Sequence, residues 1–462
     1  MIRLFNTYFA LRTIILGVSE AILVSLAFIV AMVANLGLLN ASIVLTYERG
    51  FVKLSPIVCA FLLCMYYFDL YDSMVLSNGR EAFIRTIQVM GTLCLIFAVV
   101  YYVFPSLHLG VPVFLTGTII LAVSLAGGRK LFQFVNKLDH FSESCLILGD
   151  GPLANAVKRE LANRPEFGMR AISQMGQEQL RDVFGSRSSL VLGELEGVTQ
   201  KKPIRRIIIA MDERRGKLPV EDLLRLKSAG VAIQDGLHTY ESLTGKIALE
   251  SLRPSWLLFS RGFQVSRLLL LYKRLLSVTL SLLGLLLASP FMALIALAIW
   301  CDSPGPIIFR QKRVGLNGEI FTLYKFRSMI DGVDKDGTYH PASVNDVRVT
   351  RVGRWLRAKR LDEVPQLYNI MRGDMYFVGP RPFVPNQEEE YVRAIPFYSQ
   401  RWSVRPGATG WAQVNRSYCA TLEDNAEKLA YDLFYIKNIS IGLDLLILFK
   451  TLKILLLGRG GR

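Results

Sequence analysis

One apolar segment, residues 275–300, constrains the fold of this chain more than any other feature. It contains no charged residue, and as a single helix it would be about 39 Å long. Pro290 removes a helix hydrogen bond near its middle and predicts a break at Ser289-Pro290. Cations such as Lys273 and Arg310 lie on both sides of it. This charge distribution favours a hairpin that enters and leaves a membrane by one face, although a plain fifth crossing stays open.

Four further apolar segments come earlier, and the first and third are long enough to span a bilayer. Lys and Arg precede the first, separate the second from the third and follow the fourth, whereas the loop between the third and fourth has none. The positive-inside rule therefore places both termini in the cytoplasm. These segments predict an N-terminal transmembrane four-helix bundle within residues 1–140. They are residues 13–39, 54–70, 86–104 and 111–127.

Glu20 lies inside the first of these segments. A carboxylate within a membrane is by default a candidate functional group. Its position near the cytoplasmic edge favours the plainer interpretation, in which the side chain reaches the headgroup region.

The composition agrees with a membrane protein that binds anions. The chain is 52% hydrophobic yet has a formal net charge of +16. Apolar bulk suits lipid, and excess Lys and Arg suit anionic headgroups and phosphates. No nucleic-acid partner is expected, because no helix-turn-helix, zinc-knuckle or aromatic RNA-binding signature occurs. The six cysteines include no CxxC, so neither a disulfide framework nor a zinc site is expected.

Residues 141–264 predict a truncated Rossmann-like α/β module, because strand and helix patterns alternate there. A buried strand at 145–148 leads into Gly149-Asp150-Gly151, and a helix follows. This pattern is similar to the dinucleotide fingerprint, whose backbone amides bind a pyrophosphate. No acidic residue stands about 20 residues further on to bind a ribose, and Arg170 occupies that region. A scaffold or regulatory module is therefore favoured over a redox site.

In residues 265–462, cations surround one acidic step, Asp362-Glu363. Pro365 favours a helix that begins at or just after Asp362. The helix N-terminus and Arg357 would then hold Asp362 ionised. Such a carboxylate can be a nucleophile, a metal ligand or both, or simply the N-cap of an exposed helix.

Arginines in two later loops favour phosphate binding. Arg381 lies between two prolines, and a guanidinium in such a stiff loop suits bidentate contact with phosphate. Arg405 shares its loop with two glycines and Trp411, and Lys325 and Arg327 add cations upstream. Alternatively, these basic groups could contact lipid headgroups. None of the four histidines lies in these segments, which argues against a His-based triad. Near the C-terminus, residues 439–457 predict a helix that lies in the headgroup plane.

Five segments in this order resemble the catalytic domain of bacterial polyprenyl-phosphate glycosyl-1-phosphate transferases. These monotopic phosphoglycosyl transferases start the assembly of exopolysaccharide and related glycans. The resemblance implies a C-terminal α/β monotopic catalytic domain over residues 265–462, with a re-entrant helix at 274–300 broken at Ser289-Pro290. With the four spans and the α/β module, the chain is similar to the large family members over nearly its whole length. The segments are YKFRSM, RLDEVPQL, GDMYFVGPRP, RPGATGWAQVN and YDLFYIKNIS.

The resemblance also implies a reaction. Asp362, beside Glu363, would attack the sugar-bearing phosphorus of a UDP-sugar and release UMP, and polyprenyl (undecaprenyl) phosphate would then take the phosphosugar. Mg²⁺, ligated in part by Asp362, would neutralise the crowded oxygens. Arg357 and Arg381 match family positions that contact phosphate. The segment 416–419 differs among relatives and is expected to influence sugar choice. The protein would be a multi-pass protein of the bacterial inner membrane, with its catalytic domain on the cytoplasmic face, lipid contacts and a possible homodimer.

Two other functions stay open on the sequence alone. A membrane-tethered nucleotide-sugar dehydratase would also join four spans to a dinucleotide-type fold, but the Tyr-x-x-x-Lys pair that it needs occurs nowhere in this chain. A non-enzymatic nucleotide sensor or assembly scaffold would bind nucleotide without releasing UMP. A UMP-release assay separates this scaffold from the transferase.

Overall fold

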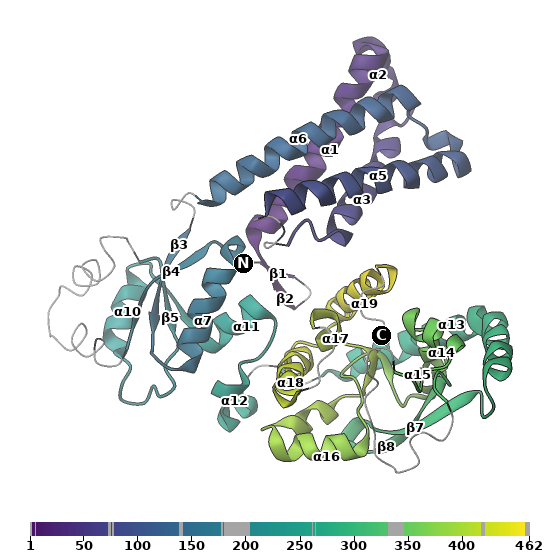
Figure 1. The fold of residues 1–462 in the computed structure, drawn as a ribbon. Coiled ribbons are helices and arrows are strands. Elements are labelled where there is room, and N and C mark those ends of the chain that lie inside the picture. Colours follow the sequence, from purple (N-terminus) through teal and green to yellow (C-terminus); the bar gives the residue numbers. More distant parts are fainter. Residues whose placement is uncertain are drawn as a thin grey trace. The chain divides into compact units, whose positions relative to one another are not determined.

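The computed structural model forms two compact units (Figure 1). The first comprises Met1–Ile2 and Tyr8–Thr239, and the second comprises Arg3–Thr7 and Tyr240–Arg462. The domain boundaries expected at residues 140 and 264 stay predictions. The residues that the structure describes are 2–4, 6–72, 75, 78–137, 142–176, 179, 204–260, 262–263, 265–330, 346–416 and 421–457.

Long apolar helices make up the first part of the first unit. Each of the four long helices has the length and composition to cross a membrane, and each overlaps one of the segments expected from the sequence. Their inward faces form one core around Phe28, Phe61 and Phe97, while many outward-facing Leu, Ile and Val side chains are exposed, as suits lipid contact. In chain order, the elements up to residue 137 are β1 (Ile2–Leu4), β2 (Thr7–Phe9), α1 (Leu11–Leu36), α2 (Leu38–Thr46), α3 (Gly50–Tyr67), α5 (Gly79–Val103), η1 (Pro105–Leu107) and α6 (Val111–Lys137), of which β1 and β2 contain residues of both units.

A buried ion pair joins α1 to α6. Arg129 donates from Nε and Nη2 to Oε1 of Glu20 at 3.2 and 3.0 Å. Glu20 is 1% exposed and Arg129 is 6% exposed, so neither side chain reaches solvent. The expectation that Glu20 extends to the headgroups is therefore wrong. The physical reason is that a buried carboxylate with a matched guanidinium does not need to reach water.

The α/β module contains a four-stranded parallel sheet in the order β4-β3-β5-β6, which agrees with the alternation of strands and helices in the sequence. In β3, Leu146 pairs with Ile207 of β5, and both side chains are fully buried. Helix α7 buries Leu153, Val157 and Leu161 on one face. The elements are β3 (Glu143–Leu148), α7 (Pro152–Asn163), η3 (Pro165–Phe167), β4 (Met169–Met175), β5 (Arg206–Ile209), α10 (Val220–Ser228), β6 (Ala232–Asp235) and α11 (Gly236–Thr244).

Other parts of the chain lie close to two glycines of the loop before α7. Gly149 has a φ of +132°, and a Cβ at this position would clash with the carbonyl oxygen of Ala210. A Cβ at Gly151, the N-cap of α7, would clash with the carboxylate of Asp212. A helix N-terminus is the usual position of a bound pyrophosphate in this fold. An internal carboxylate close to it supports the scaffold interpretation over a dinucleotide site.

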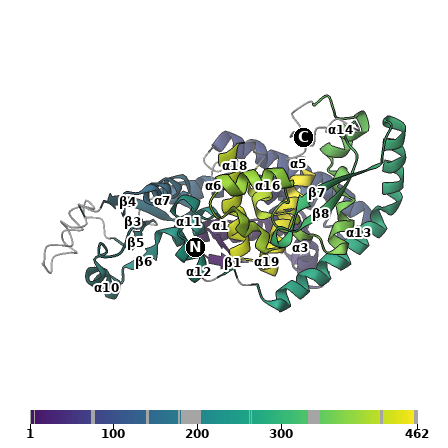
Figure 2. The same ribbon diagram turned by 90° about the horizontal axis from the view of Figure 1, so that it is seen from below.

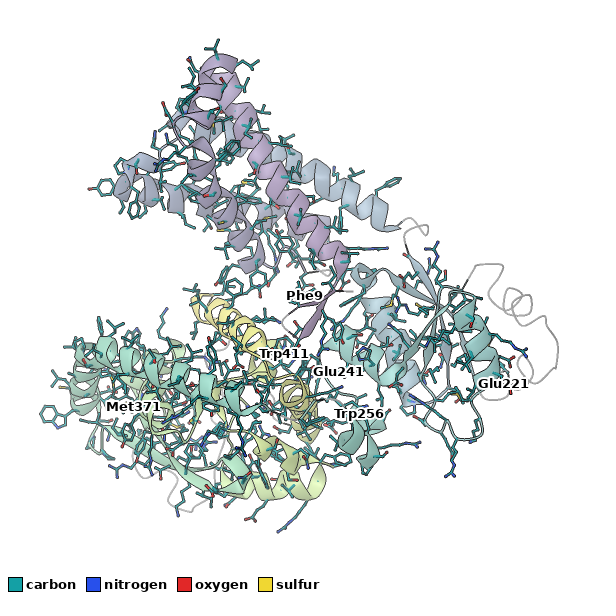
Figure 3. The ribbon with its side chains drawn as sticks, turned by 180° about the vertical axis from the view of Figure 1, so that it is seen from behind. Phe9, Glu221, Glu241, Trp256, Met371 and Trp411 are labelled. Carbon is teal, nitrogen blue, oxygen red and sulfur yellow. The ribbon has the colours of Figure 1, made fainter. Side chains whose placement is uncertain are left out.

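The second unit packs helices around two small sheets, with a core centred on α18. Phe434 and Tyr435 are fully buried there. Trp411, which is labelled in Figure 3, stacks on Phe434 with 5.8 Å between the ring centroids. Strands β7 and β8 are antiparallel, and β9 and β10 are parallel. The further elements are η4 (Leu249–Ser251), α12 (Pro254–Phe259), α13 (Arg267–Asp302), β7 (Ile308–Val314), η5 (Leu316–Gly318), β8 (Ile320–Phe326), α14 (Arg351–Ala358), η6 (Leu361–Glu363), α15 (Gln366–Arg372), β9 (Tyr376–Val378), α16 (Pro385–Ala394), η7 (Tyr398–Ser403), β10 (Gly407–Thr409), α17 (Trp411–Asn415), α18 (Leu422–Lys437) and α19 (Ile441–Leu456).

Helix α13 contains the apolar segment and bends along its length (Figure 2). Pro290 lies inside it, and Ser289 Oγ donates to the carbonyl oxygen of Leu286 at 2.8 Å. In its first half, Arg274 donates to two carbonyl oxygens at the end of α15, at 2.9 and 2.8 Å. In its second half, Ile299 packs in a cluster with side chains of β8 and α14. Both halves of the helix therefore contact other elements of the second unit.

A buried polar cluster ties α13 to α18 and α19. Lys273 Nζ lies 2.7 Å from Asp444 Oδ2 and donates to the Tyr435 hydroxyl at 2.5 Å. The Tyr435 hydroxyl in turn donates to Asp444 Oδ1 at 2.8 Å. Helix α19 lies where the sequence predicts a headgroup-plane helix, but Asp444 is only 7% exposed. Asp444 therefore does not contribute to a solvated face, because it neutralises the buried Lys273.

Candidate active site

The acidic step lies in η6, a single 3-10 turn between α14 and α15. Arg360 precedes it with a φ of 54°, in the left-handed region, and so turns the chain out of α14. The next α-helix begins at Gln366 with Pro365 as its N-cap. The helix start expected at or just after Asp362 is therefore corrected: Asp362 and Glu363 belong to a separate 3-10 turn, and the α-helix begins at Gln366.

Two cations from different elements hold Glu363. Lys325 of β8 and Arg381 of the loop after β9 donate to its Oε1, at 3.5 and 3.1 Å. Burial acts to raise the pKa of Glu363, but Arg381 and Lys325 outweigh it and lower the pKa to about 2. Glu363 is therefore an anion at neutral pH and connects η6 to β8 and to the loop after β9.

Asp362 has the opposite electrostatic environment. Burial, followed by the charge of Glu363, raises the pKa of Asp362, while Lys325 and Arg357 act to lower it. Arg357 thus acts in the direction expected from the sequence, but burial has the larger effect. Within the part of the chain that the structure describes, no side chain forms a hydrogen bond or an ion pair with the Asp362 carboxylate. Neighbouring carboxylates with pKa values shifted apart are suited to different chemical roles.

The surroundings of this pair are strongly cationic. Burial lowers the pKa of Lys325, Glu363 opposes this effect, and Arg381 and Arg313 lower the pKa further. Because Arg381 and Arg313 disfavour the charged form of Lys325, the region around the acidic pair has an excess of positive charge. Such a cluster can accept an anion with several negative charges, such as a diphosphate.

The structure separates the five predicted phosphate-binding residues into two groups. Lys325, Arg357 and Arg381 surround the acidic pair. Arg327 is 4% exposed and donates to the carbonyl oxygens of Pro304 and Ser303 at 2.9 and 2.6 Å, which satisfies groups just beyond the end of α13.

Arg405 also makes its contacts away from the acidic pair. It donates to the Tyr376 hydroxyl at 3.0 Å, and its guanidinium carbon lies 5.4 Å from the centre of that ring. A direct role of Arg327 or Arg405 in phosphate binding stays a prediction.

The influence of segment 416–419 on sugar choice also stays a prediction. Arg416 bonds to Asp424 at 2.6 Å, whereas Ser417, Tyr418 and Cys419 lie outside the described residues.

One supporting residue escaped sequence reasoning. Asn369 of α15 is fully buried, its Nδ2 donates to the carbonyl oxygen of Thr322 at 2.7 Å, and its Oδ1 accepts from the amide of Tyr324 at 3.1 Å. It therefore fixes α15 against β8, the strand that carries Lys325. The only signal in the sequence is a single amide flanked by Tyr368 and Ile370, and no spacing distinguishes it.

The residues of the site could bind Mg²⁺ only together with oxygen ligands from a substrate. Among the described residues, no group of three or more His, Cys, Asp and Glu side chains could hold a metal ion. Glu363 is bound to two cations, so Asp362 is the carboxylate of the pair open to a metal. Mg²⁺ is commonly bound by one or two carboxylates together with waters and substrate phosphates. Asp362 with a diphosphate substrate would meet that requirement.

Comparison with known proteins places this site in a family. The bacterial sugar transferase family model matches residues 268–458, which include every residue of the site. The chain is 40% identical over 240 residues to the UDP-N-acetylgalactosamine-undecaprenyl-phosphate N-acetylgalactosaminephosphotransferase of Aeromonas hydrophila, covering 52% of this chain and 56% of that protein. It is 34% identical over 342 residues to the undecaprenyl-phosphate glucose phosphotransferase of Komagataeibacter xylinus, covering 72% and 63% respectively.

A shorter relative is covered almost completely. The exopolysaccharide production protein PSS of Rhizobium leguminosarum bv. phaseoli is 40% identical over 189 residues, which is 39% of this chain and 94% of that protein. The first two relatives, by contrast, are matched over less than two thirds of their own length. The near-complete match to the third, together with the family model, shows that the chain belongs to the bacterial sugar transferase family of polyprenyl-phosphate glycosyl-1-phosphate transferases.

Proposed function

We propose that this protein transfers a sugar 1-phosphate from a UDP-sugar to polyprenyl (undecaprenyl) phosphate, giving polyprenyl diphosphate-sugar and UMP. The observation that carries the proposal is the unequal acidic pair. Glu363 is fixed by Lys325 and Arg381, whereas Asp362 faces the same cations without a hydrogen-bonded side-chain partner among the described residues. The names of the first two relatives include undecaprenyl phosphate, which supports the acceptor, and the name of the Aeromonas hydrophila relative includes a UDP-sugar, which supports the donor.

In the first displacement, a carboxylate oxygen of Asp362 attacks the sugar-bearing phosphorus. The bond from this phosphorus to the bridging oxygen breaks, and UMP leaves with that oxygen and its electron pair. Lys325, Arg357 and Arg381 neutralise the charge that builds up on the phosphate oxygens. Mg²⁺, held by Asp362 and the diphosphate, would supply further charge neutralisation.

In the second displacement, a phosphate oxygen of polyprenyl phosphate attacks the same phosphorus. The bond between phosphorus and Asp362 breaks and returns the free carboxylate, so no net proton is transferred. Splitting the transfer into two displacements lets two large substrates use one cationic site in turn.

The geometry of α13 supports a site on the cytoplasmic face of the inner membrane, where UDP-sugars are available. Both halves of α13 contact other elements of the second unit, and Leu286, Leu287 and Phe291, close to Pro290 in the sequence, are 69%, 73% and 66% exposed. A re-entrant helix that inserts this apolar region into lipid explains both observations. The reaction would begin assembly of a surface glycan such as exopolysaccharide. The homodimer suggested by large family members stays a prediction.

The decisive test replaces the proposed nucleophile. Asp362→Asn in the full-length protein should lower UMP release at least about a thousandfold, because the amide does not form the phosphosugar ester. UMP release is measured with undecaprenyl phosphate and a panel of UDP-sugars, and mass spectrometry identifies a phosphosugar adduct on Asp362 in the wild type. Glu390→Gln, on the exposed face of α16, is the control and should retain activity. Normal turnover by Asp362→Asn would refute the proposal.

A further inference from the structure

A buried charge cluster around Arg401 lies in the second unit, apart from the acidic pair and from the Lys273 cluster. Arg401 of η7 has a side chain that is 4% exposed, and its guanidinium binds two carboxylates. Nη1 lies 3.2 Å from Glu388 of α16, and Nη2 lies 2.9 Å from Asp432 of α18. The guanidinium also lies over two aromatic rings, at 4.8 Å from the centre of Phe383 and 5.0 Å from that of Tyr398. One side chain therefore joins two helices, η7 and the loop that contains Phe383.

The same guanidinium reaches the backbone of the active-site loop. Nη2 of Arg401 donates to the main-chain carbonyl oxygen of Arg381 at 2.9 Å. On either side of this position, Pro380 accepts from the amide of Gly407 at 2.9 Å, and Pro382 accepts from Arg313 at 3.1 Å. The loop is thus held at three successive carbonyl oxygens, and the bond to Arg381 comes from the guanidinium that also binds Glu388 and Asp432.

We infer that Arg401 is a positioning residue for the acidic pair. Through the carbonyl oxygen of Arg381 it fixes the backbone from which the Arg381 guanidinium reaches Glu363. Arg401 itself touches neither carboxylate of the pair in the described contacts. The effect of Arg401 on the reaction rate rests on the proposed function. Its effect on the position of the loop that contains Arg381 does not.

The chemistry of the cluster explains why arginine is needed. A planar guanidinium has five N–H donors in a fixed fork and can bind Glu388, Asp432, Tyr398 and a carbonyl oxygen together. A lysine ammonium has three donors from a single atom. Arg401→Lys therefore keeps the charge that compensates the two buried carboxylates, but does not reproduce the whole set of contacts.

The first experiment measures the loop directly by hydrogen–deuterium exchange of the full-length protein in detergent or nanodiscs. Arg401→Lys should increase deuterium uptake in the peptide that covers residues 379–384, with little change in α13. Arg393→Lys, an exposed substitution of the same kind on α16, should change neither region. Uptake in 379–384 equal to that of the wild type would overturn the inference.

The second experiment is a double-mutant cycle with Arg381. Arg401→Lys should lower kcat/KM for UMP release about tenfold when Arg381 is present, and less than about twofold in the Arg381→Ala background. A purely structural role of Arg401 would give equal factors in both backgrounds, and that result would refute the inference. A wild type without UMP release would refute the proposed function instead, and the exchange experiment would still decide the role of Arg401.

Asp432→Asn is the second variant if Arg401→Lys fails to fold. It removes one of the two carboxylates, so the single guanidinium is balanced by Glu388 alone and the fold is expected to persist. It also loosens Nη2, the nitrogen that binds the Arg381 carbonyl oxygen. Increased uptake confined to residues 379–384 would support the inference, and unchanged uptake there would overturn it.

Discussion

At the scale of single residues, the site depends on two adjacent carboxylates with different partners. Glu363 has two cationic partners and a pKa of about 2, whereas burial raises the pKa of Asp362. Because a permanent anion opposes ionisation of its neighbour, Asp362 depends on Lys325 and Arg357 for its charge. The ionisation of Asp362, the proposed nucleophile, is therefore more sensitive to neighbouring charges than that of Glu363.

This dependence predicts the pH behaviour of an Arg357→Gln variant. Arg357 lowers the pKa of Asp362, so its removal raises that pKa further, and a larger fraction of Asp362 is protonated at a given acidic pH. The acid limb of the profile of kcat/KM against pH should therefore move to higher pH. Arg354→Gln, an exposed change one turn earlier on α14, is the charge-matched control and should leave this limb in place. Superimposable acid limbs for Arg357→Gln and the wild type would contradict the assignment.

At the scale of elements, buried ion pairs fasten helices together in both units. Arg129 joins α6 to α1 through Glu20, and Lys273 joins α13 to α19 through Asp444. In each pair both side chains are nearly inaccessible. Such pairs contribute little net stability compared with apolar packing, but removal of one partner leaves a buried charge uncompensated. They therefore specify which helices pack together more than they strengthen the packing.

The ion pair between Arg129 and Glu20 allows a direct test of this cost of an uncompensated charge. Arg129→Leu should destabilise the protein by about 3–5 kcal/mol, because it leaves the Glu20 carboxylate buried without its guanidinium. The double variant Glu20→Leu with Arg129→Leu should recover most of that loss. Thermal unfolding in the same detergent compares both with the wild type. Equal stability of Arg129→Leu and the wild type would show that Glu20 finds another partner or reaches water.

At the scale of the whole molecule, local patterns in the sequence predict the elements but not their partners. Apolar length identifies the helices, and alternation identifies the parallel sheet, since both patterns are local. Arg327 belongs to one of the predicted basic clusters, yet the structure uses it at the end of α13. Arg401 attracts no attention in the sequence, because its two carboxylates lie on other helices. Side-chain direction in this chain is set by long-range packing, which sequence spacing does not encode.

The membrane arrangement is tested on the whole protein. A re-entrant α13 predicts that cysteines placed at Arg267 and Lys312, in a background without the native cysteines, react with an impermeant maleimide from the same side of sealed vesicles. Both positions are exposed and flank the apolar segment. Reaction from opposite sides would show a full crossing, and the catalytic unit would then be divided across the membrane.

The link between Lys273 and α19 has a consequence for biosynthesis. Lys273 binds Tyr435, which lies 162 positions further along the chain, and it forms its ion pair with Asp444, which lies further still. The residue that neutralises Lys273 is therefore translated long after Lys273 itself. Until α19 leaves the ribosome, closing the domain around Lys273 would bury an unmatched charge at a cost of several kcal/mol. The nascent domain should therefore stay open until its final helix emerges, and quality-control proteases would meet an incomplete copy as an unfolded one.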